Sequence, residues 1–222
     1  MRKDQTTHIR PHVDSEAYAP ARPSITDQFG RTFNYLRIAV NEKCNLRCIY
    51  CMPEEGVQFN PKNEILTTEE ILRVVKVVSD LGVNKIRFTG GEPLLRGDIT
   101  KLVGKSSSTP GIESVHLTTN GVLLDRYAGD LKESGLAGVN ISIDTLNIEK
   151  YIQITRRDEL VRAMEGLEAA KTAGIPSIKV NAVALRGFND SEIVEFVELT
   201  KDYPLTVRFI ELMPFDAHQI WK

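Results

Sequence analysis

The sequence lacks the features that direct a chain to a membrane, to nucleic acid or into a disulfide-bonded fold. It has only three cysteines and one tryptophan among 222 residues. No apolar run approaches the roughly 20 residues that cross a bilayer. The net charge of −2 gives no electrostatic reason to expect nucleic acid or an anionic membrane as a partner. An odd number of cysteines, all clustered, is a poor disulfide framework and indicates a metal or cluster role in a reducing compartment.

The first 33 residues also lack a regular pattern. They are polar, rich in proline and without an apolar core, and they contain Asp4, Asp14 and Glu16. These properties are not those of a secretory signal or a good import peptide. We therefore expect residues 1–33 to form a mobile N-terminal arm that precedes the folded domain.

Beyond the arm, short β-branched runs alternate with amphipathic ones. Six runs are typical of strands: residues 34–40, 85–90, 114–120, 138–144, 178–184 and 206–212. Helix signals lie between them, at 67–81, 123–134, 158–173 and 189–203. The first begins with a capping box, Thr67 with Glu70, and Asn189 with Glu192 opens the last. This alternation predicts an α/β fold with a parallel sheet, either open or curled into a partial barrel.

The three cysteines stand together as CNLRCIYC, with Cys44, Cys48 and Cys51 just after the first predicted strand. Their spacing suits three corners of one compact site. A structural zinc site normally closes with a fourth ligand, which the nearby sequence does not offer. Three ordinary buried thiols are a second alternative. A [4Fe-4S] cluster with three cysteine ligands is favoured, because it leaves one iron open to a further ligand, whereas electron-carrying clusters use four cysteines.

A second motif, TGGEP, ends the second predicted strand at the same edge of the sheet. Gly90 and Gly91 would let the backbone approach a ligand closely. Glu92 supplies a carboxylate that could accept a hydrogen bond from an ammonium group. Alone, the motif would be read as a tight turn with a solvated acid. Its position beside the cysteines favours a binding role.

Together, CNLRCIYC and TGGEP resemble the radical S-adenosylmethionine (SAM) superfamily. Further stretches, among them NISIDTL, IKVNAVALRGFN and VRFIELMPF, resemble the MoaA family of GTP 3′,8-cyclases over residues 27–216. The resemblance implies a partial (βα)6 TIM-like barrel with parallel strands, a radical SAM core at residues 34–216, and a [4Fe-4S] cluster with SAM as cofactors. It implies a lyase that converts GTP to 3′,8-cyclo-7,8-dihydro-GTP in the first step of molybdenum cofactor biosynthesis.

The resemblance also assigns residues to roles. The cysteines match the cluster ligands, and no general base is nominated. The residues that match SAM contacts are Tyr50, Gly90, Gly91, Glu92, Ser142 and Met213. The residues that match GTP contacts are Arg37, Arg87, Thr118 and Lys179. A cation within a buried strand is costly unless it faces a cavity, which supports the three basic assignments.

The sequence departs from the family in having no second cysteine triad and no Gly-Gly end. We therefore expect residues 217–222 to be the start of a missing C-terminal domain, and the chain to complete little or no cyclisation alone. The alternatives are a non-catalytic Fe–S or SAM-binding module and a different radical SAM enzyme, such as a peptide-modifying one. The implied partners are GTP, a one-electron donor and, in some members, a second copy, with neither nucleic acid nor membrane. The implied compartment is the mitochondrial matrix for a eukaryotic chain and the cytoplasm otherwise.

Overall fold

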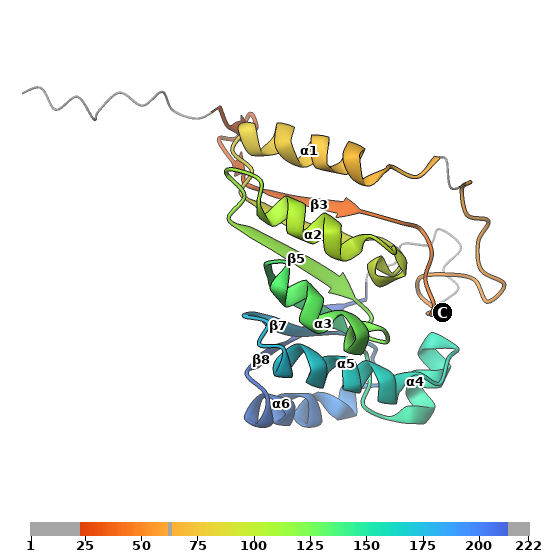
Figure 1. The fold of residues 1–222 in the computed structure, drawn as a ribbon. Helices are drawn as coiled ribbons and strands as arrows, with labels where there is room; N and C mark the ends of the chain where they lie inside the picture. Colours follow the sequence, from red (N-terminus) through yellow and green to blue (C-terminus); the bar gives the residue numbers. More distant parts are fainter. Residues whose placement is uncertain (1–22, 62–63, 213–222) are drawn as a thin grey trace, which may run out of the picture.

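A curved six-stranded parallel sheet forms the body of the molecule (Figure 1). The structure is a computed structural model, and it describes residues 23–61 and 64–212. The strands lie side by side in chain order: β3 (Tyr35–Ala39), β4 (Lys85–Thr89), β5 (Ser114–Thr119), β6 (Leu136–Ser142), β7 (Ile178–Ala184) and β8 (Leu205–Glu211). This sequential, parallel order confirms the predicted α/β partial barrel.

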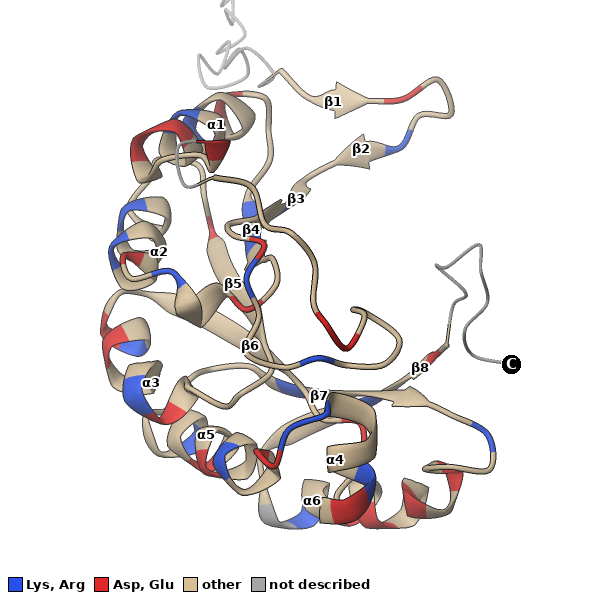
Figure 2. Cartoon of the chain, turned by 90° about the vertical axis from the view of Figure 1, so that its right-hand side faces the viewer, with Lys and Arg blue, Asp and Glu red and all other residues tan. Residues whose placement is uncertain are grey.

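Helices connect the strands and cover one side of the sheet. They are α1 (Thr68–Asp80), α2 (Ile99–Ser107), α3 (Leu124–Glu133), α4 (Ile148–Thr155), α5 (Leu160–Thr172) and α6 (Ile193–Asp202). All but α4 follow the outer side of the crescent in Figure 2. We call the opposite side of the sheet the inner face. No helix within residues 23–61 and 64–212 is long and apolar enough to cross a membrane.

The hydrophobic core lies between the sheet and the outer helices. Phe88, Leu117, Ile141 and Val180 are fully buried on the helix side. The residues beside Leu117 and Val180 are half-exposed, whereas Arg87 beside Phe88 and Asn140 beside Ile141 are buried polar residues. Helix α1 begins at the predicted capping box, in which the Thr67 hydroxyl accepts from the Glu70 amide at 3.2 Å and the Glu70 carboxylate accepts from the Thr67 amide at 2.8 Å. The strand alternation thus leaves the inner face for polar side chains.

Three parts of the fold differ from the sequence expectations. Residues 25–33 are not an arm: β1 (Ile25–Thr26) pairs antiparallel with β2 (Thr32–Phe33) through a turn in which the Asp27 carboxylate accepts from the Arg31 amide at 3.0 Å. Helices α2 and α4 were not predicted, because both are short. Residues 1–22 and 217–222 lie outside the described residues.

The helix predicted to open at Asn189 begins later, at Ile193. Asn189 precedes a 3-10 turn, Asp190–Glu192, and makes no side-chain cap bond to it. Its amide instead donates to the carbonyls of Asp144 and Val183, at 2.6 and 2.8 Å. The Glu192 carboxylate accepts from the Thr145 hydroxyl at 2.6 Å. These side chains tie the ends of β6 and β7 together, a tertiary role that a local pattern cannot reveal.

Candidate functional site

The three cysteines lie in the long loop between β3 and α1, at the carboxyl edge of the sheet. Cys44 and Cys48 are half-buried and Cys51 is exposed. The amides of Cys51 and Met52 both donate to the Cys48 carbonyl, at 2.9 and 3.0 Å, so this part of the loop is a compact turn. The Cys44 sulfur accepts from the Leu46 amide at 3.4 Å. The loop therefore holds its thiols in a fixed backbone frame.

The electrostatics of the thiols suit a bound cation or metal cluster. Burial raises the pKa of the Cys44, Cys48 and Cys51 thiols above the ordinary value, and nearby negative groups, among them Asp144 beside Cys48 and Cys51, raise the pKa further. Thiolates at these positions thus need a positive partner. Metal binding supplies it and releases the protons.

The donor set of three cysteine thiols suits a cluster bound through three cysteines. One zinc ion would need all its sulfurs at about 2.3 Å from a single centre, whereas a cluster spreads its cysteines over separate irons. The sequence offers three thiols and no more.

The TGGEP turn packs directly against the start of the cysteine loop. The Gly91 amide donates to the Asn41 carbonyl at 2.9 Å, and the Glu92 amide donates to the Lys43 carbonyl at 2.6 Å. A Cβ atom on Gly90 would lie 2.4 Å from the Asn41 carbonyl oxygen, and one on Gly91 would lie 2.3 Å from that of Lys43. The two glycines are thus required by the close approach of two loops, in addition to any ligand.

The Glu92 carboxylate is buried and hydrogen-bonded within the protein, and its predicted contact with an ammonium group of a ligand stays a prediction. Its side chain is 1% exposed and accepts three internal hydrogen bonds. These come from the Leu94 amide at 2.9 Å, the Thr119 hydroxyl at 2.7 Å and the Asn120 amide at 2.8 Å. The carboxylate therefore ties the end of β4 to the end of β5.

Tyr50 ties the cysteine loop to the far half of the sheet. Its hydroxyl donates to the Asp144 carboxylate, which also accepts from the Val183 amide at 2.8 Å. Burial raises the pKa of both Tyr50 and Asp144. Ser142, predicted to contact SAM, is half-buried at the end of β6 and pairs in register with Asn181 of β7. Met213 lies outside the described residues.

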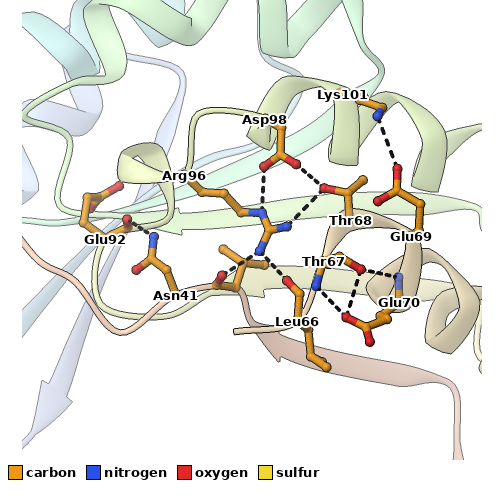
Figure 3. A network of polar contacts seen from close by, with 11 residues as sticks. Asn41, Leu66, Thr67, Thr68, Glu69, Glu70, Glu92, Arg96, Asp98 and Lys101 are labelled. Atoms are coloured by element: carbon orange, nitrogen blue, oxygen red, sulfur yellow. Dashed lines mark hydrogen bonds and ion pairs between the residues drawn. The ribbon is translucent and has the colours of Figure 1, made fainter. Parts of the chain in front are cut away.

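A polar network around Arg96 fixes the point where β3 runs into the cysteine loop (Figure 3). The Arg96 guanidinium donates to the carbonyls of Val40 and Leu66, at 2.9 and 3.0 Å, and forms an ion pair with Asp98 at 2.8 Å. Asp98 in turn accepts from the Thr68 hydroxyl at the start of α1. This network joins the chain just before Cys44 to the amino end of α1.

Basic side chains gather on the inner face of the sheet. The sequence singled out Arg37, Arg87 and Lys179, and the structure brings them together: Arg37 pairs in register with Arg87 across β3 and β4. Arg87 is 8% exposed as a whole residue. Its guanidinium donates to the Tyr35 hydroxyl at 2.9 Å and to the Thr118 hydroxyl at 3.3 Å. Arg37 is exposed, so the burial cost expected from a sheet covered on both faces does not apply to it.

Two further cations on this face were missed. Lys85 lies over the Tyr35 ring at 5.7 Å from its centroid, and Arg208 of β8 donates to the Asn181 side chain at 2.7 Å. Strand parity could have found both, since Lys85 is two residues from Arg87 and Arg208 pairs opposite Asn181. In the part of the chain that the structure describes, none of the five cations forms an ion pair with a carboxylate.

Repulsion between the cations helps to lower the pKa of Arg87 and Lys179. Burial and then the positive charges of Arg208 and Arg37 lower the pKa of Arg87, against a favourable contribution from Tyr35. Burial and the charges of Arg208, Lys85 and Arg87 lower the pKa of Lys179. An inner face with uncompensated positive charge favours a polyanionic ligand.

His116 should make the free energy of unfolding depend on pH in a way that can be measured. Burial, followed by the charges of Arg87, Lys85 and Lys179, lowers the pKa of His116 to about 4. The unfolded chain has a histidine pKa of about 6.5, so between these values it binds more protons than the folded chain does. We expect the free energy of unfolding to fall as the pH drops from about 6.5 towards 4, and His116→Gln to flatten that slope. Urea unfolding at several pH values measures it, and equal slopes for the two proteins would contradict the assignment.

Comparison with known proteins relates this arrangement to one large family. The family model described as "Radical SAM superfamily" matches residues 38–200. The GTP 3′,8-cyclase of Pelotomaculum thermopropionicum is 51% identical over 195 residues, covering 88% of this chain and 60% of the relative. Molybdenum cofactor biosynthesis protein 1 of Mus musculus is 49% identical over 204 residues, covering 92% of this chain and 32% of the relative. The chain thus spans less than two thirds of the length of these curated relatives.

Solved structures agree with the fold. Streptococcus suis SuiB bound to S-adenosylmethionine has a TM-score of 0.67 at 20% sequence identity, covering 86% of this chain and 41% of that one. Native anSMEcpe with bound AdoMet has a TM-score of 0.62 at 22% identity, covering 80% of this chain and 51% of that one. At such identities, the likeness supports the arrangement of strands and helices alone.

Proposed function

Because the chain belongs to the radical SAM superfamily, we propose that it carries the radical-generating and triphosphate-binding parts of a GTP 3′,8-cyclase. The reaction converts GTP to 3′,8-cyclo-7,8-dihydro-GTP, the first step of molybdenum cofactor biosynthesis. One observation carries the proposal: the cysteine loop and a face of five uncompensated cations belong to the same curved sheet. The identity to named cyclases supports it.

The superfamily uses a [4Fe-4S] cluster and SAM, and the residues of this chain fit both. Cys44, Cys48 and Cys51 would hold three irons and leave the fourth for SAM. When bound, the pair supplies a 5′-deoxyadenosyl radical that takes a hydrogen atom from the substrate. We assign the remaining SAM contacts to the TGGEP turn, with Gly90, Gly91 and Glu92, and to Tyr50, Ser142 and Met213.

The inner face would bind the triphosphate. Arginine guanidinium groups donate in a planar fork that matches phosphate oxygens, and lysine adds a point charge. Arg87 is already fixed by the Tyr35 and Thr118 hydroxyls, so little side-chain entropy is lost when a phosphate binds. The protein's contribution is to hold the substrate close to the cysteine edge and to exclude water from it.

The domain and cellular assignments are part of the same proposal. Residues 34–216 form one radical SAM core, which agrees with β3–β8 sharing a single sheet. The chain needs a one-electron donor to reduce the cluster, and a second copy could pair with it. It would work in the mitochondrial matrix if the source is eukaryotic and in the cytoplasm otherwise.

Arg208→Met tests the triphosphate site. We expect GTP to bind about tenfold more weakly, because a hydrogen bond to a charged group contributes about 1.5–3 kcal/mol. Isothermal titration of the reconstituted chain with GTP measures the change. Inorganic triphosphate is expected to compete with GTP, whereas guanosine is not.

Arg126→Met is the matched control, since Arg126 is an exposed arginine of α3, on the opposite side of the sheet. It removes the same charge but should leave the affinity for GTP unchanged. Equal losses in the two variants would show that only the overall charge matters and would contradict a site on the inner face.

A further inference from the structure

Helix α4 ends beneath the cysteine loop in an unusual way. Its C-cap residue, Arg156, has φ 55° and ψ 26°. Among the described residues it is the one non-glycine residue with a positive φ. The left-handed conformation is unfavourable for a residue with a long side chain, and such conformations persist where the surroundings fix them.

The last carbonyls of α4 serve as acceptors for the cysteine loop. The Arg47 amide donates to the Thr155 carbonyl at 2.9 Å, and the Ile49 amide donates to the Ile154 carbonyl at 2.8 Å. Carbonyls in the last turn of a helix have no partner within the helix. Here the residues on either side of Cys48 satisfy two of them.

The Arg156 side chain completes the connection in the other direction. Its Nη1 donates to the Arg47 carbonyl at 3.0 Å and to the Met52 carbonyl at 3.1 Å. Arg47 immediately precedes Cys48, and Met52 immediately follows Cys51. One guanidinium nitrogen therefore joins the two ends of the segment that carries two of the three thiols. Its positive charge also lies at the negative end of the α4 dipole.

We propose that Arg156 is a positioning residue for the cluster: by holding residues 47–52 at both ends, it sets the spacing of Cys48 and Cys51. The inference rests on the proposed cluster at the three cysteines. Without the guanidinium, two loop carbonyls lose their donor, and the loop can relax away from the geometry that three irons need. Partners that orient metal ligands in this indirect way affect metal affinity about 10- to 100-fold.

The backbone of Arg156 does not depend on its side chain. Its amide donates to the Ile152 carbonyl at 2.8 Å. The Thr155 hydroxyl lies 2.7 and 2.9 Å from the carbonyl oxygens of Tyr151 and Arg157 and shares its one hydrogen between them. Glycine and asparagine accept the left-handed conformation readily. Arg156→Gly and Arg156→Asn therefore remove the guanidinium while they keep, or relieve, the backbone conformation.

The experiment separates stability from cluster binding. We expect the iron-free Arg156→Gly and Arg156→Asn chains to unfold at a midpoint temperature no lower than that of the unchanged chain. After anaerobic reconstitution and desalting, both variants should retain iron about tenfold less well. The electron paramagnetic resonance spectrum of the reduced cluster should respond less to added SAM. Arg156→Lys should restore part of both signals.

Arg157→Asn is the matched control, since Arg157 is exposed and its guanidinium donates to the carbonyl of the adjacent Arg156 at 2.6 Å. It should retain iron like the unchanged chain. Normal iron content and SAM response in Arg156→Gly and Arg156→Asn would overturn the inference. A lower iron-free midpoint that accounts for the iron loss, with no rescue by lysine, would also overturn it. Failure of the unchanged chain to retain a cluster would instead contradict the proposed function.

Discussion

Replacing Cys48 with serine is expected to abolish cluster binding and to leave the iron-free fold intact. Cys48 is one of only three thiols, and a three-cysteine site has no spare ligand. A serine hydroxyl is harder than a thiol and ionises far less readily, so it is a poor substitute for a thiolate on iron. The loss of iron affinity should be larger than the effect of removing a residue that only orients a ligand, which is about 10- to 100-fold.

The iron-free fold should tolerate this change because the loop is held by other groups. Tyr50 bonds to Asp144, the amides of Arg47 and Ile49 bond to α4, and Cys48 itself contributes a backbone carbonyl that serine retains. A change of sulfur to oxygen at a half-buried site falls within the range of ordinary substitutions, about 1 kcal/mol. Far-ultraviolet circular dichroism and the unfolding midpoint of the iron-free protein measure this.

Iron and sulfide per chain, together with the visible absorption of the reconstituted protein, measure the expected loss. Ile49→Val is a suitable control, because Ile49 lies in the same loop and is 37% exposed. It should bind a full cluster. Retention of a SAM-responsive cluster by Cys48→Ser would mean that Cys48 is not a ligand and would contradict the proposed site.

The second large effect is expected from Gly91→Ala. The new methyl group would lie 2.3 Å from the Lys43 carbonyl oxygen and 2.5 Å from that of Glu42. Both are backbone atoms of the segment that leads into Cys44, so no side-chain rotation can relieve the clash. Either the TGGEP turn or residues 42–43 must move, and the hydrogen bond between the Glu92 amide and the Lys43 carbonyl must lengthen.

We expect Gly91→Ala to lower the free energy of unfolding by about 1–3 kcal/mol, as other overpacked sites do. It should also reduce iron retention, because the displaced segment carries Cys44. Gly97→Ala is the matched control: Gly97 belongs to the same connection, and a Cβ atom there meets nothing within 4 Å. Urea unfolding compares the two, and equal midpoints would show that the close approach of the loops does not constrain this glycine.

The residues of the site come from one long loop and from the strands of the sheet. The loop brings all three thiols, and it is held by Arg96 at its start, by the TGGEP turn beside Cys44, and by Tyr50 and α4 beside Cys48. The sheet supplies the five cations from four of its strands, β3, β4, β7 and β8. On the proposed function, we expect the cluster to bind at the edge and a polyanion to bind on the inner face at the same time.

Much of this arrangement could be predicted from the sequence, because its signals are local. The six strand runs match β3 to β8 within two residues at each end, and Thr67 with Glu70 marks the start of α1 correctly. The cysteine spacing and the glycine pair identify the edge of the sheet that carries them. Periodicity and capping are properties of neighbouring residues, so one sequence is enough to find them.

What could not be predicted depends on contacts between distant segments. Asn189 has the chemistry of a helix cap but bonds to β6 and β7, and Glu92 has the chemistry of a ligand but bonds to Thr119 and Asn120. In both cases the polar side chain could bond to several partners, and the tertiary structure determines which partner it meets. Alternation along the last predicted strand would place Arg208 on the inner face, but its hydrogen bond to Asn181, 27 positions away, is set by the fold.

Formation of 5′-deoxyadenosine tests the central claim most directly. The anaerobically reconstituted chain is given SAM and a strong reductant, with and without GTP, and Cys48→Ser serves as the blank. The proposed site predicts that the unchanged chain releases 5′-deoxyadenosine, that GTP raises the amount, and that the blank releases none. Absence of the product from protein that contains a full complement of iron would contradict radical chemistry at this cysteine loop.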